Sequence, residues 1–235
     1  MSNTHFTFKQ FSIHQERCAM KVGTDGCLLG AWAKLEGCNR VLDIGCGSGL
    51  IAIMAAQRCD AQITGVEIDA DAAAQAQENV DNTAWAKRIE IINCDIKNYT
   101  PKERFDAIVS NPPFFANSLK CPEEKRTQAR HSDSLTCEVL MQCAKELLTD
   151  TGTLSVVIPT DAVDTWRDEA LFKGLSTRRI TYVRTLPHKQ PKRVLVEFTK
   201  CACPQPETED FILEDSPGIY SHKARTLLKE FYLKI

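Results

Sequence analysis

The most informative segment of the chain reads Val41-Leu42-Asp43-Ile44-Gly45-Cys46-Gly47-Ser48-Gly49. The apolar residues before the glycines are typical of a buried parallel strand, the alternating glycines of a tight turn, and the apolar run over residues 50–56 of a helix. Glycine permits positive φ angles and lets the backbone approach a ligand closely. The pattern therefore predicts a strand, turn and helix that bind a nucleotide-like ligand. The alternatives are a turn that only redirects the chain and a NAD site.

The spacing of the glycines separates this unit from dinucleotide-binding turns. Gly45, Gly47 and Gly49 follow the order Gly-x-Gly-x-Gly, whereas dinucleotide sites carry Gly-x-Gly-x-x-Gly, and Asp43 stands two residues before the first glycine. This combination resembles motif I of the class I S-adenosylmethionine-dependent methyltransferases. The resemblance implies an α/β, Rossmann-like fold with a mostly parallel seven-stranded sheet and an antiparallel terminal strand. It also implies S-adenosyl-L-methionine as the cofactor.

Length and composition favour one α/β domain with short additions. A chain of 235 residues that is 43% hydrophobic suits one substantial core. We expect an N-terminal arm and cofactor-covering segment over 1–38, a methyltransferase domain over 39–200, and a C-terminal linker and short helix over 201–235. Without a signal peptide or an apolar run of about 18 residues, we expect a cytoplasmic protein with no membrane contact.

The cysteines and the overall charge restrict the classes of partner. The 11 cysteines are scattered without a Cys-x-x-Cys pair, so the sequence predicts no metal site. The net charge is −2, which leaves any contact with nucleic acid to local basic patches. No obligate protein partner is evident in the sequence.

Carboxylates stand at the ends of two further predicted strands. Glu67 ends the strand over 61–67, where its oxygens can accept hydrogen bonds from ribose hydroxyls. Asp95 follows the strand over 89–94, and the family resemblance implies that it meets the adenine amino group with Ile96 against the ring. Asp95 as a turn residue and Asp43 as a strand-end cap are the alternatives. The predicted cofactor-binding residues are Thr24, Asp25, Asp43, Gly45, Gly47, Gly49, Glu67, Ile68, Asp95, Ile96 and Asn111.

Two features precede the glycine segment. Residues 6–15 alternate apolar and polar side chains, which indicates one strand or a small hairpin. Thr24 or Asp25 can cap the apolar helix that follows at 27–33. By resemblance, the capped turn also lies over the cofactor pocket, and the two roles are compatible because a helix N-terminus can serve both.

Asn111-Pro112-Pro113-Phe114 follows the predicted strand over 105–110 and is the second informative segment. Consecutive prolines stiffen the turn, so the Asn111 side-chain oxygen and the Pro112 carbonyl can accept both hydrogens of a planar amine. Phe114 can stack on a flat substrate. We therefore predict these four residues to be catalytic, acting mainly by positioning the amine for methyl transfer. A rigid turn without chemistry is the alternative.

The order of the two segments resembles amino methyltransferases that act on adenine N6, guanine N2 or a glutamine amide. The segment Asn111-Pro112-Pro113-Phe114, called the clamp below, does not by itself distinguish among these three kinds of amine. Over nearly its whole length, the chain most resembles the bacterial tRNA1(Val) (adenine-37-N6)-methyltransferase family, including Phe8-Lys9-Gln10-Phe11, the segment from Lys21 to Trp32, and Phe231-Tyr232-Leu233. The resemblance implies a tRNA substrate, contacted at the anticodon stem-loop. The alternatives are rRNA guanine-N2 methylation, protein glutamine-N5 methylation and a silent RNA-binding partner.

Basic residues gather in two stretches. One is the loop after the clamp, and the other is residues 173–200, which contain eight Lys and Arg residues against the single Glu197. Such charge suits RNA phosphates, although a solvated loop and a charged edge strand have the same composition. The second stretch is expected to form strands over 178–186 and 194–199, with a linker at 201–217 and a helix over 221–232 capped by Ser221. The predicted RNA-binding residues are Lys125, Arg126, Arg130, Arg184, Lys189, Lys192 and Arg193.

Overall fold

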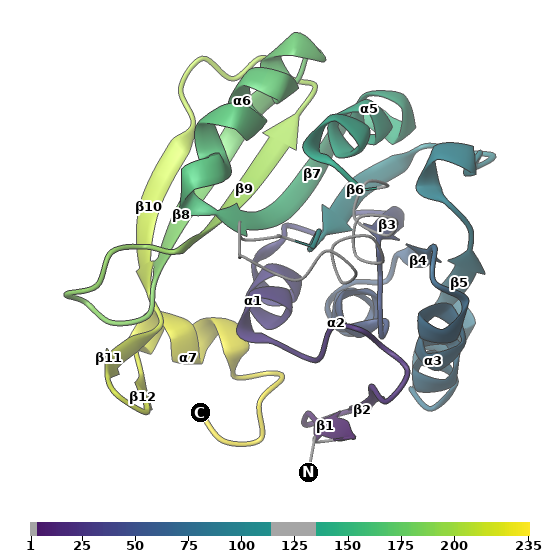
Figure 1. Ribbon diagram of the computed structural model, residues 1–235, viewed down its shortest axis with the longest axis horizontal. Helices are drawn as coiled ribbons and strands as arrows, with labels where there is room; N and C mark the ends of the chain where they lie inside the picture. The colour runs from purple at the N-terminus through teal and green to yellow at the C-terminus, as the bar shows by residue number, and fades with distance from the viewer. Residues whose placement is uncertain (1–3, 114–134) are drawn as a thin grey trace, which may run out of the picture.

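The computed structural model describes residues 4–113 and 135–235, which form a central sheet covered by helices on both faces (Figure 1). The eight-stranded sheet has the order β10-β8-β9-β7-β6-β3-β4-β5. Among its described strands, β9 alone runs antiparallel to its neighbours, β7 and β8. The strands span Arg40–Ile44 (β3), Gln62–Glu67 (β4), Ile89–Asn93 (β5), Phe105–Ser110 (β6), Leu148–Pro159 (β7), Ser176–Arg184 (β8), Arg193–Thr199 (β9) and Glu207–Ile212 (β10).

The predicted class I methyltransferase fold is confirmed, with one strand more than expected. Residues 201–217, which we expected to form a linker, contain β10, and β10 pairs in parallel with β8. The strand was missed because residues 207–210 are polar and exposed, as an edge strand permits. The division of the chain at residues 38 and 200 stays a prediction.

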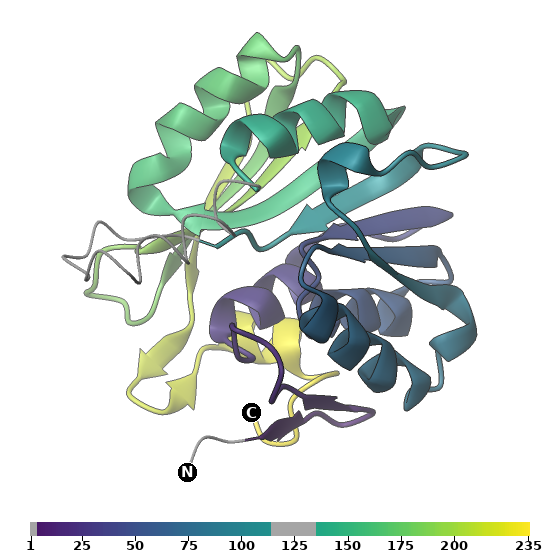
Figure 2. The ribbon, with the colours of Figure 1, turned by 45° about the vertical axis from the view of Figure 1, so that its right-hand side comes forward.

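Alternating side chains along the strands build a separate core on each face of the sheet. Val41 belongs to the cluster under α1, α2 and α7, whereas Leu42 and Ile44 belong to the cluster under α5 and α6. Figure 2 shows these two helical layers on opposite sides of the sheet. The helices span Thr24–Trp32 (α1), Leu50–Arg58 (α2), Ala70–Asp81 (α3), Cys137–Leu147 (α5), Val163–Phe172 (α6) and His222–Leu228 (α7), with 3₁₀ turns at Ala86–Arg88, Ile96–Asn98 and Thr160–Ala162.

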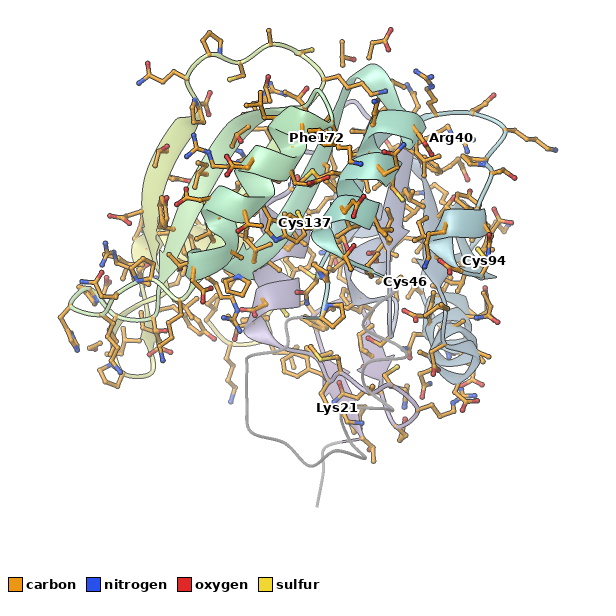
Figure 3. All side chains as sticks on the ribbon, turned by 45° about the horizontal axis from the view of Figure 1, so that its top comes forward. Lys21, Arg40, Cys46, Cys94, Cys137 and Phe172 are labelled. Carbon is orange, nitrogen blue, oxygen red and sulfur yellow. The ribbon has the colours of Figure 1, made fainter. Side chains whose placement is uncertain are left out.

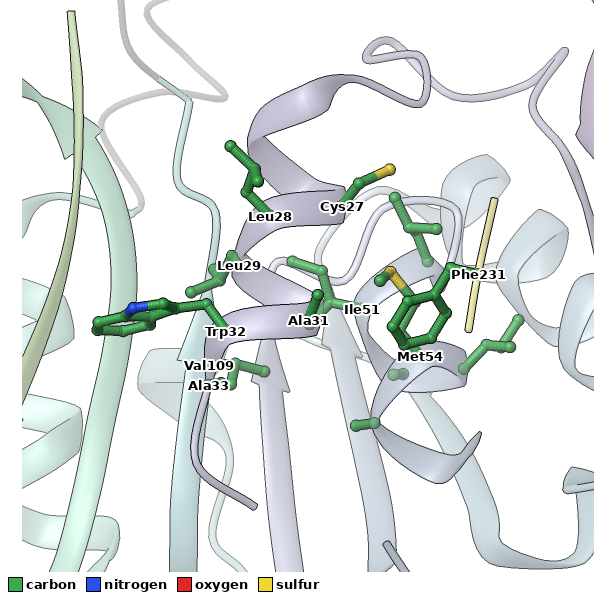
Figure 4. Close-up of a cluster of buried hydrophobic side chains, with 14 of the residues drawn as sticks. Cys27, Leu28, Leu29, Ala31, Trp32, Ala33, Ile51, Met54, Val109 and Phe231 are labelled. Atoms are coloured by element: carbon green, nitrogen blue, oxygen red, sulfur yellow. The ribbon is translucent and has the colours of Figure 1, made fainter. Parts of the chain in front are cut away.

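The beginning and the end of the chain pack together beside α2. The predicted N-terminal arm is a hairpin of β1 (His5–Thr7) and β2 (Ser12–His14). The backbone N–H of Lys9 donates to the carbonyl of Phe231 at 2.8 Å, and Phe231 is buried among residues of α1 and α2 (Figure 4). A small hairpin, β11 (Glu214–Ser216) with β12 (Ile219–Tyr220), leads to α7, whose N-cap is Ser221 as predicted.

The described part of the chain contains no helix that is long and apolar enough to cross a bilayer. Within the same residues, no three His, Cys, Asp or Glu side chains gather in a group that could hold a metal ion.

Candidate active site

The glycine turn lies at the carboxyl edge of the sheet, between β3 and α2. Gly45, Gly47 and Gly49 have φ angles of 70°, 54° and 80°, which residues with a Cβ rarely adopt. The backbone N–H groups of Gly45 and Cys46 donate to the carbonyl of Val66 at 2.8 and 3.2 Å, which fixes the turn against β4. No protein atom among the described residues lies within 4 Å of the position that a Cβ at Gly47 would occupy. The turn is therefore open on that side to a ligand.

Glu67 connects the glycine turn to the start of α3. Its carboxylate is nearly buried and accepts hydrogen bonds from the backbone N–H of Gly47 at 2.8 Å and of Asp69 at 3.0 Å. Each carboxylate oxygen has a further lone pair, so these bonds leave capacity for ligand hydroxyls. The predicted ribose contact thus also holds the turn in place, a role that sequence spacing did not reveal.

Asp43 is fully buried beneath the turn. Its Oδ2 accepts a hydrogen bond from the backbone N–H of Ala52 at 3.0 Å, whereas its Oδ1 has no hydrogen-bond partner among the described residues. Burial raises the pKa of Asp43 from 3.8 to about 7, although the hydrogen bond from Ala52 opposes the shift; the nearby Glu67 carboxylate adds to it. A buried acceptor without a partner is costly, and a cationic or hydrogen-bonding ligand would relieve that cost.

A shallow, half-open pocket lies beside the turn. It brings together four predicted cofactor residues, which are Gly45 in the glycine turn and Ile68, Asp95 and Ile96 at the ends of β4 and β5. Asp95 also caps the turn at 96–98 by accepting a hydrogen bond from the Lys97 N–H at 3.0 Å. This is the turn role that was the alternative, and the contact of Asp95 with adenine stays a prediction. The remaining lining residues are Ile44, Val66, Cys94 and Leu135 (Cys94 is labelled in Figure 3). Apolar walls with one carboxylate suit a flat ring that carries an amino group.

The Asn-Pro-Pro segment begins where β6 ends, next to the glycine turn. The hydroxyl of Ser110 donates to the carbonyl of Ile44 at 2.8 Å, which ties the ends of β6 and β3 together. A Cβ at Gly26 would lie 3.7 Å from Asn111 Nδ2 and 3.3 Å from Leu50 Cδ2. The first turn of α1 therefore packs between Asn111 and the start of α2. Phe114, Lys125, Arg126 and Arg130 lie outside the described residues.

The prediction that Thr24 or Asp25 caps α1 is wrong. The N-cap is Gly23, in extended conformation and without a side-chain hydrogen bond, and Thr24 is the first helical residue. Asp25 Oδ2 instead accepts a hydrogen bond from Arg193 Nε at 2.7 Å. The structure thus pairs a residue that we expected to bind the cofactor with one that we expected to bind RNA. Sequence reasoning missed this pair because 168 positions separate its members.

Asn79 on α3 is a site residue that sequence reasoning missed. Its amide donates to the carbonyls of His14 and Ser48 at 2.8 and 2.9 Å and accepts from the His14 N–H at 2.9 Å, and its side chain is buried. Asn79 thereby connects the glycine turn to the N-terminal arm. Burial and then the charge of Glu67 raise the pKa of the Cys18 thiol to about 11, so the arm also comes within electrostatic reach of Glu67.

Comparison with solved structures supports the fold. A predicted O-methyltransferase from Agrobacterium tumefaciens superposes with a TM-score of 0.66 over 88% of this chain and 96% of its own, at 21% identity. The glycopeptide N-methyltransferase MtfA, solved with S-adenosyl-L-methionine, superposes with a TM-score of 0.56 over 77% of this chain and 90% of its own, at 14% identity. At these identities the comparison concerns the fold alone.

Comparison of sequences identifies the family. The family model described as "Methyltransferase small domain" matches residues 27–165. The tRNA1(Val) (adenine(37)-N6)-methyltransferase of Bacteroides fragilis is 47% identical over 100% of both chains, and that of Trichodesmium erythraeum is 43% identical over 100% of both. Because the identity is high and extends over both whole chains, the protein belongs to the tRNA1(Val) (adenine(37)-N6)-methyltransferase family.

Proposed function

We propose that the protein transfers a methyl group from S-adenosyl-L-methionine to the exocyclic N6 of adenine 37, next to the anticodon of tRNA1(Val). The observation that carries this proposal is the packing of Asn111 against Gly26 in the first turn of α1, beside the start of α2, in a chain related over its whole length to enzymes with that name. With a tRNA substrate, we expect the enzyme to act in the cytoplasm.

Three features fit the cofactor. The open side of Gly47 admits a ligand close to the backbone, the orphaned Oδ1 of Asp43 suits an amino group, and the pocket that contains Asp95 suits the adenine ring. We assign the ribose hydroxyls to Glu67 and the ring to Ile68, Asp95 and Ile96. We also assign the cover of the site to Thr24 and Asp25, which begin α1. S-adenosyl-L-methionine, when bound, supplies a methyl group on a sulfonium, which is already activated for transfer.

The clamp residues orient the target amine. The side-chain oxygen of Asn111 and the carbonyl of Pro112 accept the two N–H groups of adenine N6, which favours a pyramidal nitrogen whose lone pair faces the methyl group. Phe114 stacks on the base. No strong base is needed, because the proton leaves after transfer, and correct orientation supplies much of the rate enhancement. The adenine must leave its stack to reach Asn111, which costs less in an anticodon loop than in a duplex.

The test is methylation of unmodified total tRNA with isotopically labelled S-adenosyl-L-methionine, followed by nucleoside digestion and mass analysis. We expect labelled N6-methyladenosine. Labelled N2-methylguanosine would show that the enzyme methylates guanine N2 in place of adenine N6. Absence of label from RNA, with the cofactor still bound, would favour a glutamine side chain or a silent partner role.

Variants of the clamp separate chemistry from binding. Asn111→Ala should abolish methyl transfer, because it removes an acceptor for the amine, and leave the cofactor dissociation constant nearly unchanged. Glu67→Ala should weaken cofactor binding. Asn82→Ala is the matched control, because Asn82 is exposed at the end of α3 and its amide donates to the nearby carbonyl of Glu78. Equal loss of binding and transfer in Asn111→Ala would contradict its assigned role.

A further inference from the structure

The fold divides the basic stretch over 173–200 between two opposite edges of the sheet. β8 and β6 run in the same direction, so the end of β8 lies at the edge that carries Asn111, and its beginning lies at the far edge. At the far edge, Lys173 pairs with Glu138 and Glu169, and Arg178 and Arg179 both face the buried Glu197. These far-edge cations are occupied by carboxylates, and they lie away from the clamp.

At the active-site edge, two arginines hold the backbone of two lysines. Arg184 Nη1 donates to the Lys189 carbonyl at 2.9 Å, and Arg193 Nη1 donates to the Lys192 carbonyl at 3.1 Å. Carboxylates meet both guanidinium groups, Asp210 at 3.3 Å from Arg184 and Asp25 at 2.7 Å from Arg193. Both arginines are thus hydrogen-bonded to the loop backbone and ion-paired with carboxylates, whereas the side chains of Lys189 and Lys192 are exposed.

The loop that presents these lysines is held at several points. The N–H of Lys189 donates to the Leu186 carbonyl at 3.0 Å, and the hydroxyl of Thr160 donates to the Pro191 carbonyl at 2.9 Å. Pro187 and Pro191 further restrict the backbone. A loop ordered in this way presents its charges without a large entropic cost on binding.

A continuous path of contacts connects this loop to the clamp. Lys192 precedes Arg193, which pairs with Asp25, and the adjacent Gly26 packs against Asn111. On the side of β8 away from β9, the edge strand β10 exposes Glu207, Glu209 and Asp210. Asp210 pairs with Arg184 and Glu209 with Lys223, so this acidic strand offers phosphates no unpaired cation among the described residues. A polyanion bound by the lysines is therefore directed toward the clamp.

We propose that Lys189 and Lys192 bind two backbone phosphates of the RNA near the target base, and that Arg184 and Arg193 are positioning residues that set the loop. This inference rests on the proposed tRNA substrate. It revises the expectation that all four residues contact RNA. Lysine suits the role because it acts as a point charge on phosphate without reading a base.

The salt dependence of tRNA binding tests the proposal. Each phosphate contact on a single strand contributes about 0.7 to the slope of log affinity against log salt. The double variant Lys189→Ala/Lys192→Ala should therefore bind unmodified tRNA more weakly, with a slope smaller by about 1.4. Arg184→Ala/Arg193→Ala should also weaken binding, but with the slope of the unaltered protein. Lys87→Ala, an exposed lysine beside the beginning of β5, should change neither quantity.

Each outcome decides one part of the proposal. An unchanged slope in the double lysine variant would overturn the phosphate contacts, and a reduced slope in the double arginine variant would overturn the positioning role. Because both lysines are exposed, their replacement leaves the core intact. Failure of the unaltered protein to methylate tRNA would overturn the proposed function instead, and that assay is independent of the slopes.

Discussion

Replacing Asp43 by asparagine should change how stability depends on pH. The folded chain holds this carboxyl in a fully buried position with a pKa of about 7, compared with 3.8 for an ordinary Asp. Between these values the folded state binds more protons than the unfolded state, so the free energy of unfolding falls as pH rises from about 4 to about 7. The difference between the two pKa values corresponds to a loss of about 4 kcal/mol, which is then constant above pH 7.

The asparagine of the Asp43→Asn variant would be neutral throughout, so the variant should escape this loss. Its amide nitrogen would occupy the position of an oxygen that has no partner among the described residues, which adds a penalty of about 1–3 kcal/mol that does not vary with pH. The diagnostic quantity is therefore the difference in unfolding free energy between the variant and the unaltered protein without cofactor. This difference should shift by about 4 kcal/mol in favour of Asp43→Asn between pH 4 and pH 8.

Urea unfolding over pH 4 to 9, followed by circular dichroism, measures this difference. Carboxylates that do not interact with Asp43 make the same contribution in both proteins and cancel from this difference. The unaltered protein should also bind the cofactor more tightly as pH rises through 7, because the ionised Asp43 attracts a cation, whereas the variant should lose that dependence. A stability difference that stays constant from pH 4 to pH 8 would refute the reasoning.

Two further variants test the connections between the ends of the chain and the site. Asn79→Ala removes three hydrogen bonds to His14 and Ser48, so we expect the free energy of unfolding in urea to fall by about 2–4 kcal/mol. We also expect weaker cofactor binding by calorimetry, with Asn82→Ala again as the control. An unchanged cofactor affinity would contradict the connection between the N-terminal arm and the glycine turn. Phe231→Ala should lower the free energy of unfolding by about 3–5 kcal/mol, because Phe231 is only 2% exposed. Leu233→Ala is the control, because Leu233 is 59% exposed and its replacement should lower the same quantity by less than about 0.5 kcal/mol. Similar losses in both variants would show that Phe231 adds no packing.

The strands and the glycine turn could be predicted because their information is local. Val41, Leu42 and Ile44 are the apolar residues typical of a buried parallel strand, and the following glycines take the positive φ angles that their spacing suggested. β10 escaped prediction because its polar residues lie at an exposed edge, where pairing with β8 rather than side-chain burial defines the strand.

The placement of Glu67 and Asp95 at strand ends could be predicted from the sequence, whereas the contacts between distant residues of the candidate site could not. Sequence order placed Glu67 and Asp95 at strand ends, and Asp95 lines the pocket beside the glycine turn. The hydrogen bond from Gly47 to Glu67 and the pairing of Asp25 with Arg193 depend on tertiary packing. No local pattern encodes a contact between residues so distant in the chain.

The contact between the arm and the C-terminal segment affects how the protein is made. Lys9 and Lys229 are hydrogen-bonded across 220 positions, so a ribosome synthesises one of them long after the other. The glycine turn and its neighbouring strands can pair earlier, but the arm can dock on Phe231 only after that residue leaves the ribosome. The bonds of Asn79 to His14 and Ser48 join residues that are synthesised early, so we expect the arm to reach the glycine turn first and to gain its C-terminal support only at the end of synthesis.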